Sequence, residues 1–215
     1  MFRILNIPPL FIASCAVAAI ACDARRRLPA FYLFKPLTTV LIVASFLAQA
    51  PVASAAARDC VLFALLASLA GDIALMFDGT RAFVVGLLAF LCAHLAFAAG
   101  LLWDLPRFAL GIPAAAGPGV AVAMLVVLWP RVGRLRVAVV IYAIVLTAMW
   151  LAAAARSTVL GDSAAQLALI GASLFMLSDG VLAWDRFINR FSLARMLVLA
   201  TYFPALWLLT CSGTF

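Results

Sequence analysis

Two aspartates lie deep inside apolar segments of this chain, where a carboxylate is costly. Asp72 lies in the segment LLASLAGDIALMF and Asp179 in LIGASLFMLSDGVLAW, and the chain has only eight acidic residues, none of them Glu. A carboxyl at membrane depth is tolerated when it faces the interior of a helix bundle, finds a partner or stays protonated. Two such carboxyls, one protonated and one ionised, can donate and accept a proton in turn. We therefore predict that Asp72 and Asp179 are catalytic.

Four other polar side chains fall within apolar runs and are candidates for binding a polar substrate. Lys35 is the only lysine and His94 the only histidine. Thr38 follows Lys35 by one helical turn on the same face, and Tyr202 lies in the last apolar run. A structural interpretation stands beside each: a lysine near a helix end can extend to the membrane interface, and His or Tyr can pack between helices.

The composition predicts an all-α integral membrane protein. Of the 215 residues, 68% are hydrophobic and 11% charged, and no long polar stretch could fold outside a membrane. A helix that spans the bilayer needs about 20 apolar residues. Such runs predict one transmembrane domain, an eight-helix bundle with spans at about 6–23, 31–49, 59–77, 82–102, 110–129, 136–155, 164–184 and 193–211.

The basic residues indicate the orientation of the chain. The gaps after the odd-numbered spans hold ten arginines, whereas the other side holds four: Arg3, Arg58, Arg107 and Arg156. Because cytoplasmic loops are enriched in Lys and Arg, both termini are predicted to lie outside the cytoplasm. The predicted location of the protein is a bacterial inner (plasma) membrane. The same rule accounts for the net charge of +7, so no nucleic-acid partner is expected. The five cysteines match no zinc-binding pattern.

This orientation brings the unusual residues to a common depth. Asp72 and Asp179 are each about five residues from the cytoplasmic end of a predicted span, and Lys35 is about four residues into its own span. At a rise of 1.5 Å per residue, all three are expected within roughly 8 Å of the cytoplasmic boundary. His94, Tyr142 and Tyr202 are expected nearer the middle of the membrane.

The two aspartates also occur in similar local sequences. The pattern small-Asp-x-x-Leu recurs at residues 71–75 and 178–182, and four spans separate the two copies. Because four is even, the halves are predicted to be two parallel four-helix repeats, related by a pseudo-two-fold axis along the membrane normal. Asp72 and Asp179 would then face each other across this axis.

Several of these segments resemble the YhhN-like lysoplasmalogenase family. The similar segments are FKPLTT at residues 34–39, Gly71-Asp72, residues 86–94, residues 171–179 ending in Ser178-Asp179, and Tyr202. The resemblance covers nearly the whole chain and implies an eight-helix membrane bundle. The implied activity is hydrolysis of the vinyl-ether bond of lysoplasmalogens, which bear ethanolamine or choline, to a fatty aldehyde and a glycerophospho-alcohol. The aspartates are the residues that the family suggests as catalytic.

Two carboxyls suit this reaction. Protonation of the outer carbon of a vinyl ether gives an oxocarbenium ion, and water then adds to form a hemiacetal that collapses to aldehyde and alcohol. The reaction needs a proton donor and a negative group near the cation, which glycosidases supply with two carboxyls. No cofactor or metal is required, and one histidine excludes a multi-histidine zinc site. We predict that the lysophospholipid lies among membrane lipids and is bound by Lys35 at its phosphate and by Thr38, His94, Ser178 and Tyr202.

A proton-coupled lipid or small-molecule transporter is the main alternative, because membrane carboxylates also serve as proton relays. An enzyme pocket should be closed at one end, whereas a transporter needs access from both faces. An intramembrane aspartyl protease is disfavoured, since the chain has no Tyr-Asp pair and Asp72 follows Leu-Ala-Gly rather than Gly-x-Gly. A lipid-binding scaffold without turnover is the third interpretation.

Overall fold

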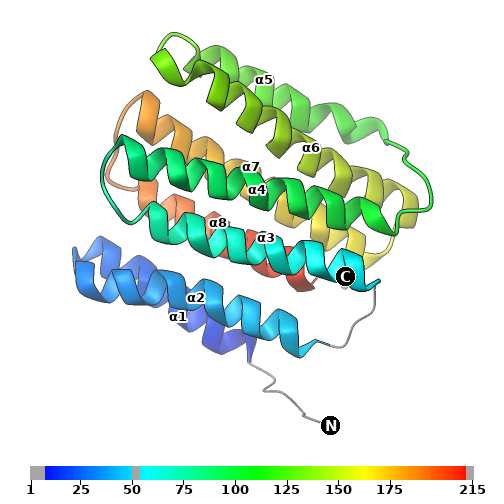
Figure 1. Ribbon diagram of the computed structural model, residues 1–215, viewed down its shortest axis with the longest axis horizontal. Coiled ribbons are helices and arrows are strands. Elements are labelled where there is room, and N and C mark those ends of the chain that lie inside the picture. Colours follow the sequence, from blue (N-terminus) through cyan, green and yellow to red (C-terminus); the bar gives the residue numbers. More distant parts are fainter. Residues whose placement is uncertain (1–7, 50–53, 212–215) are drawn as a thin grey trace.

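The structure, a computed structural model, describes residues 8–49 and 54–211, and these form a helical bundle without strands (Figure 1). Arg3 and the start of the first predicted span, at residue 6, lie outside the described residues. One helix occupies each predicted span: α1 (Pro9–Ala24), α2 (Leu28–Ala48), α3 (Ala55–Ala74), α4 (Thr80–Trp103), α5 (Ala116–Leu128), α6 (Arg136–Leu160), α7 (Ser163–Phe187) and α8 (Ala194–Cys211). Short 3₁₀ helices, Ile112–Ala115 and Gly133–Leu135, precede α5 and α6. The predicted all-α fold is confirmed.

The helices run nearly parallel or antiparallel to one another. Figure 1 shows α1 and α2 at one edge of the bundle, α5 and α6 at the opposite edge, and α3, α4, α7 and α8 between them. The closest helix pairs are α3 with α4 and α7 with α8, and α4 also packs against α6. The four central helices are therefore flanked by a helix pair on each side.

Among the described residues, four helical segments are long and apolar enough to cross a membrane: Leu28–Ala48, Thr80–Trp103, Gly133–Leu160 and Ser163–Phe187. Helices α1, α5 and α8 are apolar but shorter. Helix α3 has 20 residues but carries three charged side chains, those of Arg58, Asp59 and Asp72. The chain is thus an integral membrane protein with four helices that meet the length and composition required of a span.

The loops that follow α1, α3, α5 and α7 all lie at the same end of the bundle (Figure 1). The ten arginines that the sequence assigns to one side of the membrane flank these four loops. At the opposite end, side-chain caps begin two helices: Ser54 accepts the Ala57 N–H at 3.3 Å, and Asp162 accepts the Ala165 N–H at 2.7 Å. Gly161, at a φ of 67°, makes the left-handed turn between α6 and α7.

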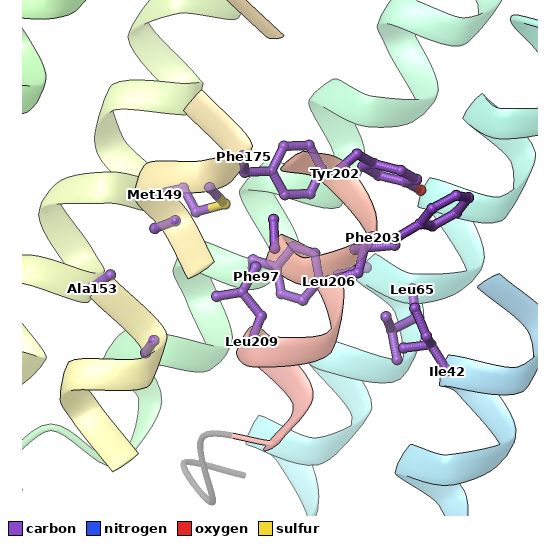
Figure 2. Close-up of a cluster of buried hydrophobic side chains, with 14 of the residues drawn as sticks. Ile42, Leu65, Phe97, Met149, Ala153, Phe175, Tyr202, Phe203, Leu206 and Leu209 are labelled. Atoms are coloured by element: carbon purple, nitrogen blue, oxygen red, sulfur yellow. The ribbon is translucent and has the colours of Figure 1, made fainter. Parts of the chain in front are cut away.

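Small residues bring the central helices close together. A Cβ on Gly71 would lie 2.6 Å from a ring carbon of Phe90, and one on Gly86 would lie 2.7 Å from Leu75, so α3 and α4 meet where side chains are absent. Figure 2 shows Phe175 of α7 beside Tyr202 of α8, with Phe97 of α4 nearby. These aromatic rings form the centre of the core, next to the buried polar residues.

Candidate functional site

Asp72 lies at the centre of the first polar cluster, two residues before the end of α3. Asp72 is 1% exposed, and its Oδ2 accepts hydrogen bonds from the hydroxyls of Thr39 and Tyr202, each at 2.7 Å. Lys35 Nζ lies 3.4 Å from Oδ1 and donates to the Asp72 backbone carbonyl at 3.0 Å. A carboxylate with a cation and two hydroxyl donors has the partners that buried negative charge requires.

Asp179 lies at the centre of the second polar cluster, on α7. Its Oδ2 accepts a hydrogen bond from the Tyr142 hydroxyl at 2.7 Å and lies 3.6 Å from Nε2 of His94. The Asp179 side chain is 12% exposed, whereas that of His94 is fully buried. Asp179 thus has weaker polar support than Asp72 and retains some open surface.

Aromatic rings connect the two clusters. The Phe175 ring contacts Tyr202 at 5.5 Å and His94 at 4.6 Å between centroids, and both contacts are edge-to-face. Tyr202 is bonded to Asp72, and His94 lies 3.6 Å from Asp179, so Phe175 contacts one member of each cluster. Among residues 8–49 and 54–211, no hydrogen bond or ion pair joins the two aspartates directly. The clusters are neighbours with Phe175 packed against both.

The two clusters share the same spacing along the chain. Lys35 and Tyr142 are 107 residues apart, as are Asp72 and Asp179, and each of the first pair contacts the aspartate 37 residues further on. Helix packing follows the same shift, because α3 packs on α4 as α7 packs on α8, and α4 packs on α6 as α8 packs on α2. The second half thus has a neutral phenol where the first has an ammonium ion.

Two other predicted site residues, Thr38 and Ser178, hydrogen-bond to backbone carbonyls rather than to the aspartates. The Thr38 hydroxyl donates to the Phe34 carbonyl of its own helix at 2.8 Å. The Ser178 hydroxyl donates to the Val198 carbonyl at 3.2 Å and so links α7 to α8. Neither side chain hydrogen-bonds to either aspartate.

Two residues of the clusters were not assigned to the site from the sequence. Thr39 is the neighbour of Thr38 in the FKPLTT segment, and the helical spacing from Lys35 favours Thr38. For Tyr142 the sequence predicts only a depth near the middle of the membrane. Its offset of 107 residues from Lys35, equal to the offset between the aspartates, is the signal that could have identified it.

Three hollows surround these clusters. An apolar groove between α4, α5, α6 and α7 has Tyr142 and Asp179 in its wall. A polar vestibule of about 640 Å³ lies at the end of the bundle where the arginines gather, lined in part by Arg26, Arg186, Arg190 and Arg195. A small cavity lined by Lys35 shares Leu75, Asp185 and Ala194 with the vestibule. In the part of the chain that the structure describes, no three His, Cys or Asp side chains gather as metal ligands do.

Comparisons with known proteins agree with the resemblance noted above. A model of the YhhN family matches residues 30–213. Lysoplasmalogenase TMEM86B of Homo sapiens is 34% identical over 207 residues, which cover 94% of this chain and 84% of the human protein.

Shorter matches occur with the rodent proteins of the same name. That of Rattus norvegicus is 48% identical over 58 residues (27% of this chain, 23% of the rat protein), and that of Mus musculus 42% over 76 residues (35% and 30%). No solved structure gives a significant match. With a helical bundle, two aspartate clusters and matches along most of its length, the chain belongs to the YhhN family.

Proposed function

We propose that this membrane protein hydrolyses the vinyl-ether bond of lysoplasmalogens and releases a fatty aldehyde and a glycerophospho-alcohol. Two findings support the proposal. The human lysoplasmalogenase is similar along 94% of the chain. In addition, Asp179 forms part of the wall of an apolar groove and has no basic partner other than the nearby His94 among the described residues. The position of Asp179 is the main support for the mechanism, because vinyl-ether hydrolysis needs an acid beside the apolar chain of the substrate.

The two aspartates have different roles in this proposal. Asp72 is the ionised member, because Lys35, Thr39 and Tyr202 together offer one positive charge and two hydroxyl donors to its carboxylate. Its negative charge is fixed by these partners rather than available for proton transfer. Asp72 therefore acts as the positioning carboxylate, which holds Tyr202 beside Phe175 and the second cluster.

Asp179 is the protonated member and the proton donor. No lysine or arginine pairs with it in the described residues, and a buried carboxyl without a cation favours its neutral form. Tyr142 already donates to Oδ2, which leaves Oδ1 to hold the proton. Glycosidases likewise keep one carboxyl protonated beside an ionised one.

The reaction then needs one water and no other reactant. Asp179 transfers its proton to the outer vinyl carbon, and the electron pair of the double bond forms the new C–H bond. The Asp179 carboxylate stabilises the oxocarbenium ion, and water attacks the carbon that bears the ether oxygen. Asp179 takes a proton from that water, which restores the acid. The hemiacetal then collapses as its C–O bond to glycerol breaks and its hydroxyl proton passes to the glycerol oxygen, which gives the aldehyde and the free glycerol hydroxyl.

We also propose the topology that the sequence predicts. All eight helices cross the bilayer as two parallel four-helix repeats, and the end that holds the ten arginines faces the cytoplasm of a bacterial cell. The equivalent placement of Lys35 and Tyr142, and of Asp72 and Asp179, supports the repeat. The arginines at one end of the bundle support the orientation, in which both termini lie outside.

The direct test is aldehyde release by the purified protein in lipid nanodiscs. We expect release from lysoplasmalogen and none from the saturated 1-alkyl lysophospholipid, in which no carbon can accept the proton. In D₂O the aldehyde should carry one deuterium beside its carbonyl carbon, since that carbon receives the transferred proton. If neither ethanolamine nor choline lysoplasmalogen is cleaved, the proposed function is wrong.

A transporter remains the rival, and it is tested in the same preparation. The protein reconstituted in vesicles should not move a fluorescent lysophospholipid between leaflets faster than empty vesicles. Flipping that depends on a proton gradient, without aldehyde release, would favour the transporter.

A further inference from the structure

Two hollows of opposite chemistry meet inside this bundle. The vestibule carries four arginines and three aspartates, an excess of one positive charge, and Asp23 pairs with Arg195 at 2.6 Å. The groove beside Asp179 is smaller, about 90 Å³ against about 640 Å³, and its wall is almost entirely apolar. A ligand that fits both must have a negative head and an apolar tail.

Phe83 of α4 and Leu182 of α7 line both hollows and so form the boundary between them. The guanidinium of Arg186 stacks over the Phe83 ring at 4.6 Å, so a positive charge lies at this boundary. Asp179 is one helical turn before Leu182 on the same helix. The carboxyl and the arginines therefore lie on opposite sides of a short apolar constriction.

We propose that a single-chain phospholipid binds across this constriction, with its phosphate among the vestibule arginines and the first carbons of its chain in the groove. This inference rests on the proposed function for the identity of the bond that reacts. In a lysoplasmalogen only the glycerol separates the phosphate from the vinyl ether, so this placement puts the vinyl carbons beside Asp179. The small groove holds only the start of the chain, and the rest extends past α5 towards the bilayer.

The arginines replace Lys35 as the principal phosphate ligands in this arrangement. Lys35 Nζ already contacts the carboxylate and the backbone carbonyl of Asp72. Moving it to a phosphate would leave a buried carboxylate without its cation, which is strongly unfavourable. Arg26 and Arg190 are exposed in the vestibule, and guanidinium groups bind phosphate oxygens in pairs of hydrogen bonds.

The head half of the site is tested by binding without turnover. The probe is radiolabelled 1-O-hexadecyl-glycerophosphocholine, which has no vinyl ether, bound to the full-length protein in nanodiscs. We expect Arg26→Gln/Arg190→Gln to raise its Kd at least about tenfold and the Lys versions of both to keep most of the affinity. The matched control is Arg131→Gln/Arg134→Gln, which removes the same charge from the α5–α6 loop. Equal affinity of the vestibule variant and wild type, or an equal loss in the control, would overturn the proposal.

The tail half is tested by filling the groove. A Cβ on Gly180 would lie 3.2 Å from the end of Met124, so Gly180→Leu places a side chain beside Asp179, whereas Gly119 on α5 faces open space. We expect Gly180→Leu to weaken the hexadecyl probe and to leave binding of chain-free glycerophosphocholine unchanged, and Gly119→Leu to change neither. Glycerophosphocholine that binds as tightly as the hexadecyl probe would rule out the groove. Normal probe binding without aldehyde release would instead reject the proposed function and leave this site in place.

Discussion

Tyr202 of α8 donates its hydroxyl to Asp72 of α3, 130 residues earlier in the chain, at 2.7 Å. His94 of α4, the last helix of the first half, lies 3.6 Å from Asp179 of the second half. Each aspartate therefore has a polar neighbour on the last helix of the other half of the chain. This exchange explains why the two clusters share the centre of the bundle, although each aspartate also has a partner from its own half.

Loss of the Tyr202 hydroxyl should destabilise the protein. Tyr202→Phe removes one of two hydroxyl donors from a carboxylate that is 1% exposed, and a buried polar group left short of a partner costs about 1–3 kcal/mol. The measurement is the free energy of unfolding in mixed detergent micelles. Tyr32→Phe, at an exposed tyrosine, is the control. A Tyr202→Phe protein as stable as that control would show that the bond contributes nothing.

The Lys35–Asp72 pair should show strong coupling. Lys35→Met leaves the carboxylate without its cation, and breaking a buried pair typically costs about 3–5 kcal/mol. Lys35→Met/Asp72→Asn removes both charges and should recover a large part of that loss. The same unfolding assay on the two single variants and the double variant gives the coupling. Additive losses would mean that the two charges do not stabilise each other.

A larger side chain at Gly71 should disturb the close packing of α3 on α4. Its Cβ would overlap the Phe90 ring, which packs edge-to-face on Tyr202, so Gly71→Ala should destabilise by about 1–3 kcal/mol. Gly119→Ala places the same methyl in open space within α5 and should stabilise by about 0.5–1 kcal/mol. The melting temperatures of the two variants should therefore shift in opposite directions. A shift in the same direction would contradict the packing.

Loss of the Tyr142 hydroxyl should lower the rate of aldehyde release more than it affects folding. Tyr142→Phe removes the hydrogen bond that the phenol donates to Oδ2 of Asp179. One such bond to a reacting group corresponds to a rate loss of about tenfold to a hundredfold. We expect that loss in aldehyde release from lysoplasmalogen, with the affinity for the alkyl probe unchanged. A full rate in Tyr142→Phe would remove Tyr142 from the site.

The fold was largely readable from the sequence, but the partners within the site were not. Runs of apolar residues locate helices directly, and every predicted span holds one helix. Contacts between helices depend on their rotation and register, which one sequence does not specify. Thr38 and Thr39 illustrate this, since a rotation of about 100° between neighbouring residues decides which hydroxyl reaches Asp72. Lys35, Asp72 and Tyr202 could be assigned to the site because charged and polar groups are rare at such depth, but the sequence did not pair Lys35 or Tyr202 with Asp72.

Asp179 donates the proton and Asp72 holds its neighbours in place, and the rate of aldehyde release by Asp179→Asn distinguishes these two roles. Asn has nearly the shape of Asp but cannot donate an acidic proton. Asp179→Asn should bind the alkyl probe normally and lose at least about a thousandfold in rate, within the range for a lost general acid. Asp72→Asn should instead lower stability and activity together. Aldehyde release by Asp179→Asn at the wild-type rate would show that Asp179 is not the proton donor.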